Sequence, residues 1–463
     1  PSSMRAENYS TTYGLDMVNA TEVWDAYNTQ GEGVEVAVLD TGMDDSHPDL
    51  PELDDEHWQA WDSDGNPIDS EPSDSSGHGT HVSGTVAGAE SPAGDVPTFG
   101  VAPDVELYHG QVIPGGGGSF TQVAAGMEWA VDTAGVDIIS MSLGAGGYYT
   151  EMIEPSENAR DAGVILVASA GNGGAGTSGS PGNVYPNFAS GAVDENADVA
   201  GFSGGETVDT SSAWGSDAPD DWPDEYVVPN AAAPGVDVLS SVPGGGYDGT
   251  YSGTSMSAPH KTGVFALVLS AAGGGLDRQT AIEAIEDTAW KPDDAPEPPG
   301  TPDTRYGVGI VDAKAAADQV ALDSGVTGTV TDSAGDAVEG ATVAVEETGF
   351  EAETGPDGEY TVLSPPGNYT VTASGFGYEE TSANVSVPDN ETFVEQNLTL
   401  ADALGVEPVS GQPEAIEGGQ QFEVQVNVAN LETYSVERAG DYNGSLTFEL
   451  NGAEIEEGED VDV

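Results

Sequence analysis

Long apolar runs alternate with helical periodicity over the first two thirds of the chain. The segments GVEVAVLD (33–40), VDIISMSL (136–143) and GVILVASA (163–170) are almost continuously apolar. Such runs are typical of strands that are buried on both faces of a parallel sheet. A helical pattern, FTQVAAGMEWAVDTAG (120–135), lies between the first two of them. Strands and helices in this rhythm predict a doubly wound α/β domain, which we bound at residues 1–322.

A different pattern begins after residue 325. Short β-prone stretches are separated by the turn sequences AGD, PDG and PPGN, and helical periodicity is missing. These features predict a small all-β sandwich over residues 325–400. Segment 401–463 contains QFEVQVNVAN and NGSLTFEL, in which apolar and polar residues alternate as they do in strands. We expect this segment to begin another β-sandwich, which the chain does not complete.

The charge balance is extreme, with 82 acidic residues, 8 basic residues and a net charge of −74. The negative charges on such a surface repel one another in dilute buffer. Molar salt shortens the Debye length to about 3 Å and screens this repulsion. The composition therefore predicts a protein built for a salt-saturated environment. The scarcity of basic residues argues against nucleic acid as a partner.

The chain has no cysteine, which excludes disulfides, thiolate metal sites and a cysteine nucleophile. No run of 18 apolar residues occurs, so we expect no membrane span. The first residues, PSSMRAENYS, lack the basic and apolar regions of a signal peptide. We expect either that a signal was removed or that the sequence is a fragment.

Three short motifs carry candidate chemistry. AVLDTGMD places Asp40 at the carboxyl end of an apolar run, GHGTHVSGTVAG places His78 at the start of a helix, and GTSMSAPH places Ser255 before another apolar run. A serine hydroxyl becomes a nucleophile when an imidazole accepts its proton and a carboxylate orients that imidazole. Alone, Asp40 reads as a turn residue, His78 as a core or capping residue and Ser255 as a helix N-cap. Together, in this order, they favour a catalytic triad.

These motifs resemble those of the subtilisin-like serine proteases, the subtilases of peptidase family S8, from about Leu15 to Ala316. The resemblance implies that Asp40 orients, His78 is the base and Ser255 is the nucleophile. It also implies that Asn172 of ASAGN donates to the oxyanion, together with the backbone N–H of Ser255. Asn172 could instead occupy a left-handed turn position.

The substrate site follows from the same resemblance. It implies two pocket walls and a peptide-pairing edge, built from Ser142, Leu143 and Gly144, from Ala168, Ser169, Ala170 and Gly171, and from Gly116 and Gly117. Small residues would leave the pocket roomy, so we expect broad specificity with an apolar or aromatic preference. The alternative is that these glycines serve only as turn residues.

Metal binding is a further expectation. Asp49 of HPDL resembles a calcium ligand of the family, although it could simply start a turn. His78 and His81 are three residues apart, which would suit a metal pair on a helix, but no further zinc ligand pattern accompanies them. We expect His81 to pack beneath the helix.

One departure from the family pattern and two carboxyl-terminal segments remain. Lys261 follows SAPH, where a charge needs an exposed face or a carboxylate partner. Residues 325–400 resemble carboxypeptidase regulatory-like sandwiches, and residues 401–463 resemble adhesion-type sandwiches, which suggests cell-surface or glycan attachment. We expect a secreted, halolysin-like serine endopeptidase that acts on polypeptides. The rival is a non-catalytic surface protein that has kept a protease-like scaffold.

Overall fold

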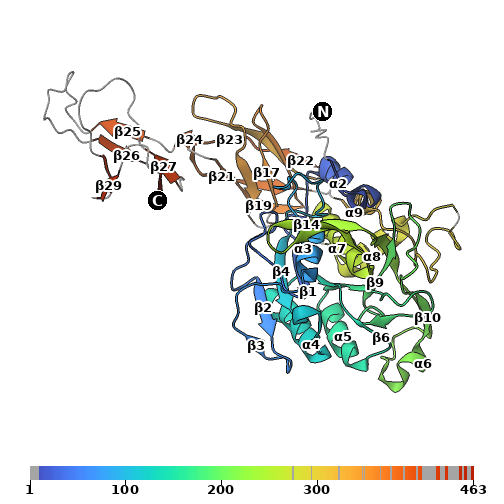
Figure 1. Cartoon of the computed structure of the whole chain (residues 1–463). Coiled ribbons are helices and arrows are strands. Elements are labelled where there is room, and N and C mark those ends of the chain that lie inside the picture. The colour runs from blue at the N-terminus through green and yellow to red at the C-terminus, as the bar shows by residue number, and fades with distance from the viewer. Residues whose placement is uncertain are drawn as a thin grey trace. The chain divides into compact units, whose positions relative to one another are not determined.

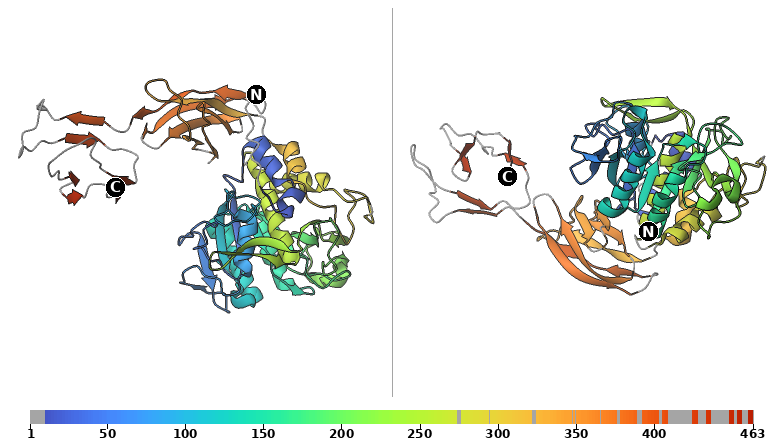
Figure 2. Two further views of the ribbon diagram at one scale, coloured as in Figure 1. Left: turned by 45° about the horizontal axis from the view of Figure 1, so that its top comes forward. Right: turned by 90° about the horizontal axis from the view of Figure 1, so that it is seen from below.

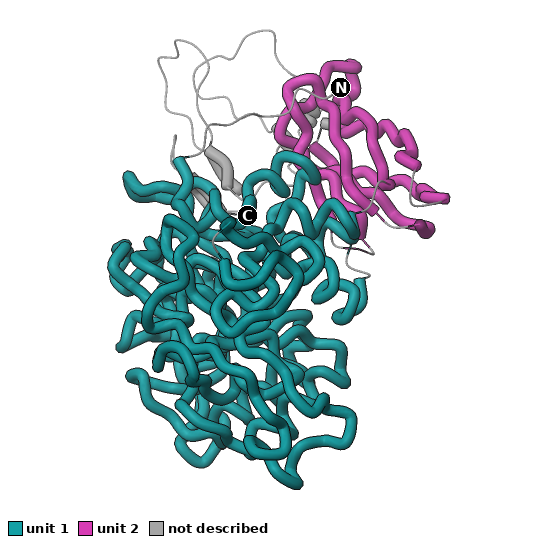
Figure 3. Tube along the Cα trace, turned by 90° about the vertical axis from the view of Figure 1, so that its right-hand side faces the viewer, with its two compact units in different colours: residues 1–322 teal, residues 323–463 magenta. Residues whose placement is uncertain are grey.

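The computed structural model describes residues 10–402, apart from 274–275, 294, 322–323, 347, 349, 365, 376–377 and 389–391, and beyond residue 402 only six short strands. The chain divides into two compact units, residues 1–322 and 323–463, which Figure 3 colours separately. The amino-terminal segment, for which we expect either a removed signal or a fragment, falls almost wholly on residues 1–9, outside the described residues. Most of the expected sandwich at 401–463 also lies outside them.

An eight-stranded sheet forms the centre of the first unit, in the order β12-β9-β7-β5-β1-β4-β2-β3 (Figure 1). All neighbouring strands are parallel except β2 and β3. The strands are β1 (Glu35–Asp40), β2 (Trp58–Trp61), β3 (Pro67–Ile68), β4 (Glu106–Gln111), β5 (Ile138–Met141), β7 (Ile165–Ser169), β9 (Phe188–Val193) and β12 (Ala231–Pro234). The three apolar runs form β1, β5 and β7, which are buried along almost their whole length.

Helices cover both faces of this sheet (Figures 1 and 2). Helices α3 and α7 share one apolar core with the sheet, and α4 and α5 share a second core on the opposite face. The helices are α1 (Tyr13–Met17), α2 (Ala20–Tyr27), α3 (His78–Ala87), α4 (Phe120–Trp129), α5 (Ile153–Asp161), α6 (Thr210–Ala213), α7 (Thr254–Ala271), α8 (Arg278–Thr288) and α9 (Ala313–Val320). The doubly wound α/β fold class is therefore confirmed.

Short elements connect the layers. They are β6 (Ala145–Gly146), β8 (Gly179–Ser180), β10 (Glu206–Asp209), β11 (Glu225–Val228), β13 (Val238–Val242), β14 (Gly246–Tyr251), η1 (Pro114–Gly116), η2 (Ala130–Ala134), η3 (Thr150–Met152) and η4 (Gly215–Asp217). In the described part of the chain, no helix combines the length and the apolar character that a bilayer crossing requires.

Strand β1 is the point where the winding of the sheet changes direction. Its neighbours are β4 on one side and β5 on the other, and the chain completes the side that holds β2, β3 and β4 before it continues to β5 on the other side. Crevices open at the carboxyl ends of strands at such a point, and ligands bind there. The last residue of β1 is Asp40.

The second unit is rich in strands. One sheet has the order β17-β16-β19-β21, and another has β18-β15-β22 with β23 also paired to β15. Apolar residues of both sheets form one core that includes Val326, Val343, Tyr360 and Val371. The strands are β15 (Gly325–Thr331), β16 (Thr342–Val345), β17 (Phe350–Glu353), β18 (Glu359–Leu363), β19 (Gly367–Ser374), β20 (Tyr378–Glu379), β21 (Thr381–Val387), β22 (Phe393–Glu395), β23 (Leu398–Thr399), β24 (Ala401–Asp402), β25 (Gly405–Pro408), β26 (Val424–Asn427), β27 (Thr433–Ser435), β28 (Phe448–Leu450), β29 (Ala453–Ile455) and β30 (Asp460–Asp462). The expected all-β character of this part is confirmed.

Lys261 contradicts the expectation that a charge in α7 needs an exposed face or a carboxylate partner. The side chain is completely buried. Its Nζ donates to the main-chain carbonyls of Ala189, at 3.0 Å, and Ala231, and it lies 5.1 Å from the centre of the Phe188 ring. Burial lowers the pKa of Lys261 well below its usual range, against a smaller opposing effect of Glu286. The main chain of the sheet therefore replaces the expected carboxylate partner.

We expect Lys261→Met to stabilise the first unit at neutral pH by about 1 to 3 kcal/mol, because an amine no longer has to be buried. Between its lowered folded pKa and its ordinary unfolded pKa, the lysine binds more protons in the unfolded chain, so stability rises with pH. The advantage of methionine should therefore shrink toward pH ~10. All 7 tryptophans lie in residues 1–322, so tryptophan fluorescence during chemical unfolding in molar salt measures this unit.

Lys314→Met is the matched control, because Lys314 is partly exposed and pairs with Asp318 on the surface of α9. It should change stability by less than ~1 kcal/mol. A Lys261→Met protein that is less stable than the parent at both pH values would show that the two hydrogen bonds to carbonyls outweigh the burial of the amine.

Candidate active site

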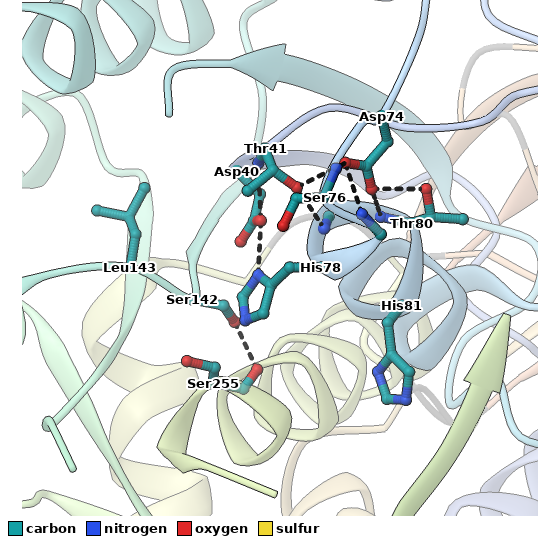
Figure 4. A network of polar contacts seen from close by, with 12 residues as sticks. Asp40, Thr41, Asp74, Ser76, His78, Thr80, His81, Ser142, Leu143 and Ser255 are labelled. Atoms are coloured by element: carbon teal, nitrogen blue, oxygen red, sulfur yellow. Dashed lines mark hydrogen bonds and ion pairs between the residues drawn. The ribbon is translucent and has the colours of Figure 1, made fainter. Parts of the chain in front are cut away.

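Asp40 and His78 form a hydrogen-bonded pair at the carboxyl end of β1 (Figure 4). The Asp40 carboxyl group is completely buried, and its Oδ1 lies 2.7 Å from His78 Nδ1. The same oxygen accepts the backbone N–H of Thr41 at 2.7 Å. His78 is the first residue of α3, with 25% of its side chain exposed. Because Nδ1 donates to the carboxylate, Nε2 is the nitrogen that can accept a proton.

The surroundings of His78 favour its charged form. Burial alone would lower the pKa of His78, but the charge of Asp40, their hydrogen bond and the charge of Asp74 outweigh it and raise the pKa above its ordinary value. A base that takes a proton during a reaction needs such stabilisation of the imidazolium.

Ser255 is the second residue of α7, which begins at Thr254 after the N-cap Gly253. The N-cap interpretation of Ser255 is therefore wrong. Ser255 and His78 line one cavity, and Figure 4 shows the serine beside the imidazole ring. Among the described residues no hydrogen bond joins their side chains, and this contact is often long in free enzymes and tightens with substrate. The backbone N–H of Ser255 lies in the first turn of α7, where N–H groups lack helical partners.

Asn172 lines the same cavity. Its Oδ1 accepts hydrogen bonds from the backbone N–H of Thr254 at 2.9 Å and from the Thr254 hydroxyl at 3.1 Å. The amide is therefore fixed by its oxygen, and Nδ2 remains available as a donor. The left-handed backbone here falls on Gly171, with φ of 106°, so the turn interpretation of Asn172 is wrong. The motifs do not predict this role of Thr254, although Thr254 directly precedes Ser255.

The cavity has a volume of about 1150 Å³. The predicted substrate residues that line it are Ser142, Leu143, Gly144, Ser169, Gly171, Gly116 and Gly117. Ala168 and Ala170 do not, which corrects the expectation for those two. They are buried in the core that β7 shares with α4 and α5. Alternate residues of a strand face opposite sides of the sheet, so the odd-numbered neighbours reach the cavity and the alanines do not.

The glycine edge of the cavity is open. Gly115 and Gly116 have φ values of 67° and 84°, which explains glycine at both positions. A Cβ atom added at Gly117 would meet nothing within 4 Å. An extended peptide can therefore approach the main chain of this edge and pair with it.

Asp49 does not fit the expected calcium site. Its carboxylate is buried, and its two oxygens accept hydrogen bonds from the backbone N–H of Ala93 at 2.7 Å and from the Tyr247 hydroxyl at 2.5 Å. Calcium requires six to eight oxygen ligands, about 2.3–2.6 Å away, whereas here hydrogen donors occupy both oxygens. In the described part of the chain no group of three or more acidic or histidine side chains could hold a metal. Asp49 anchors the loop before β4 to Tyr247.

The side chain of His81 lies on the buried side of α3, in agreement with its expected role in packing. Its Nε2 lies 3.0 Å from the carbonyl of Val238 and 3.2 Å from that of Asp248, and its ring stacks on Tyr251 at 4.4 Å. Burial lowers the pKa of His81 to about 4. The ring is therefore neutral at physiological pH and serves in packing.

Comparison with known families agrees with this geometry. A model of the subtilase family matches residues 31–309, and a model of the carboxypeptidase regulatory-like domain matches residues 325–401. The chain belongs to the subtilase family. This membership agrees with a serine endopeptidase of the subtilisin type.

Individual subtilases are similar to the first unit. Subtilisin DY of Bacillus licheniformis is 35% identical over 268 residues, which cover 56% of this chain and 84% of that protein. Subtilisin E of Bacillus subtilis (strain 168) is 36% identical over 268 residues, or 56% of this chain and 61% of that protein. An intracellular serine protease of Paenibacillus polymyxa is 34% identical over 270 residues, or 57% of this chain and 74% of that protein.

Proposed function

We propose that this subtilase hydrolyses peptide bonds through an acyl-enzyme on Ser255. The observation that carries the proposal is the 2.7 Å hydrogen bond between Asp40 Oδ1 and His78 Nδ1, together with the cavity that His78 and Ser255 line. His78 Nε2 takes the hydroxyl proton as Ser255 Oγ attacks the carbonyl carbon, and then gives it to the leaving amine. Water repeats the sequence to release the acyl group. Asp40 keeps the proton on Nδ1 and stabilises the imidazolium.

Two donors meet the developing oxyanion in this proposal. One is the Nδ2 of Asn172, whose oxygen is held by Thr254. The other is the backbone N–H of Ser255 at the positive end of α7. Donors that are already fixed need no reorganisation as charge develops, which is why they lower the barrier.

Substrate preference follows from the cavity lining. The lining residues include no lysine, arginine, aspartate or glutamate in the described part of the chain. Apolar side chains contribute, among them Leu143 and Phe120, beside many glycines. These features support broad cleavage of polypeptides with an apolar or aromatic residue before the scissile bond.

A fluorophosphonate probe tests the function. It should label the native protein in molar salt, and Ser255→Ala should abolish labelling. Ser252→Ala is the matched control, because Ser252 is an exposed serine three residues away. It should label like the parent. A native parent that takes no label would instead support the non-catalytic scaffold.

We also propose that the protein is secreted and halolysin-like in its salt adaptation. The described basic side chains support the proposed salt adaptation. Lys261 and Lys291 have no exposed side-chain surface, and Arg278 and Arg305 donate to main-chain carbonyls. Arg160 and Lys314 are only about a quarter exposed and pair with carboxylates. The exposed acidic residues therefore have few cations between them.

Dilution from molar salt to 0.1 M salt, where the Debye length is about 10 Å, should unfold the first unit and abolish activity. Circular dichroism and peptide hydrolysis over a sodium chloride series measure both. Sucrose at matched water activity is the control, since it excludes itself from the surface without screening charge. A folded spectrum and full activity in dilute buffer would contradict the proposal.

For the second unit we propose attachment to a cell surface or a glycan. Its match to the carboxypeptidase regulatory-like domain and its separate core support an independently folded appendage. Removal of residues 323–463 should leave hydrolysis of a soluble peptide unchanged and reduce retention on cell envelopes. Equal retention of the shortened and full chains would refute this role.

A further inference from the structure

Asp74 lies at the centre of a polar network at the start of α3 (Figure 4). Its Oδ1 accepts hydrogen bonds from the Thr41 hydroxyl and from the backbone N–H groups of Ser76 and Gly77, each at 2.9 Å. Its Oδ2 accepts the N–H and the hydroxyl of Thr80, at 2.9 and 2.8 Å. The hydrogen bonds to main-chain and side-chain donors lower the pKa of Asp74 despite its burial, so the carboxylate stays charged.

This network fixes the place where α3 begins. The N-cap residue Gly77 has no side chain to bond the first N–H groups of the helix. Asp74 supplies the missing acceptors on both sides of His78, to Ser76 and Gly77 before it and to Thr80 after it. The backbone of the proposed base is thereby held by a carboxylate four residues earlier.

The network also reaches Asp40 through Thr41. The Thr41 hydroxyl donates to Asp74 and accepts the backbone N–H of Gly79 at 2.8 Å. The backbone N–H of Thr41 donates to Asp40 Oδ1, the same oxygen that bonds His78. One residue thus connects the carboxylate of the pair, the first turn of α3 and Asp74.

We propose that Asp74 is a positioning residue for the Asp40–His78 pair, acting through the Thr41 hydroxyl and the first turn of α3. It holds the two side chains at their 2.7 Å separation before substrate arrives. Its negative charge also favours the imidazolium. The inference rests on the roles proposed above for Asp40 and His78.

A pH profile can detect the effect of the Asp74 charge on the pKa of His78, because the other titratable neighbours of the Asp40–His78 pair are neutral. His81 on α3 and His109 on β4 are buried, which lowers the pKa of each to about 4. Burial raises the pKa of Tyr251 on β14. In the described part of the chain, the groups whose charge raises the pKa of His78 are therefore Asp40 and Asp74.

Asp74→Asn is the first test. It keeps the size of the side chain but removes the charge and places an amide N–H against a donor of the helix. Active-site titration with a fluorophosphonate counts the folded sites, and kcat is then expressed per titrated site. We expect kcat per site to fall on the order of tenfold to 100-fold with KM little changed, because the pair is displaced and substrate contacts are not. The acid limb of kcat/KM should move to lower pH, since a charge that raises the pKa of His78 is lost.

Glu71→Gln is the matched control, an exposed carboxylate in the same loop that should leave kcat and the acid limb unchanged. If the titrated sites of Asp74→Asn turn over at the parental kcat with an unmoved acid limb, Asp74 only stabilises the loop and the proposal is overturned. A parent that takes no label would instead refute the proposed function.

Thr41→Val and Thr41→Ser test the connection without removing Asp74. Valine deletes one of the five donors to that carboxylate, so the fold should persist even if Asp74→Asn does not fold. We expect Thr41→Val to lower kcat per site and Thr41→Ser, which keeps the hydroxyl, to match the parent. Equal kcat for Thr41→Val and the parent would overturn the inferred link.

Discussion

Alanine at either Ser255 or His78 should lower kcat about 10⁶-fold, the loss seen for the nucleophile or base of subtilisin, and alanine at both should lower it little further. The reason is that the imidazole acts only by taking the serine proton, so neither group contributes without the other. Hydrolysis of a chromogenic peptide in molar salt, with purified proteins free of parental activity, measures the three rates.

The same series separates the triad from the rest of the site. A residual rate about 10³-fold above that in water should survive in all three variants, because Asn172 and the peptide-binding edge remain. Ser252→Ala is the control for a nearby exposed serine and should keep the parental kcat. Losses that multiply in the double variant would show that Ser255 and His78 act independently, which contradicts the proposed mechanism.

Strand positions were predictable because the strands of a parallel sheet that is covered on both faces appear in the sequence as continuous apolar runs. Such strands require apolar side chains in both directions, and the runs at 33–40, 136–143 and 163–170 contain β1, β5 and β7. The helix expected at 120–135 is α4, followed by the π turn η2. These elements depend on local pattern and burial, which the sequence carries directly.

Contacts between distant segments were less accessible. The sequence offered two solutions for Lys261, solvent or a carboxylate, but the structure uses carbonyls of Ala189 and Ala231, which lie 72 and 30 residues away. Asp49 likewise looked like a metal ligand until Tyr247, 198 residues later, was seen to donate to it. A motif indicates which chemical group is present, whereas the fold determines which atoms of distant residues contact that group.

In the candidate site, too, local motifs were predictable and contacts between distant residues were not. Three motifs predict Asp40, His78 and Ser255 in this order. They do not predict a role for Asp74, which stands in DSSGH, four residues before His78. An acidic residue just ahead of a helix whose N-cap is glycine is a signal for capping. Its link to Thr41 could not be predicted, because that contact joins residues 33 positions apart.

Asp40→Asn should lower kcat about 10⁴-fold while leaving the fold intact. The amide keeps the size of the carboxyl group in a completely buried site, but it cannot stabilise the imidazolium and can present a donor to His78 Nδ1. That contact favours the tautomer with the proton on Nε2, which cannot act as a base toward Ser255. Asp64→Asn, which removes an exposed carboxylate, is the control and should keep the parental kcat.

The small remaining activity should also change its dependence on pH. In the parent, burial lowers the pKa of His78, but the charge and hydrogen bond of Asp40 outweigh burial and raise it. With Asp40 neutral, burial dominates, so His78 loses its proton at lower pH and the acid limb of kcat/KM shifts in that direction. Rate profiles in molar salt from about pH 4 to about pH 9 cover both limbs. An acid limb at the parental pH, or a shift toward higher pH, would mean that Asp40 does not govern the protonation of His78. The proposed role of the Asp40–His78 pair in catalysis would then be wrong.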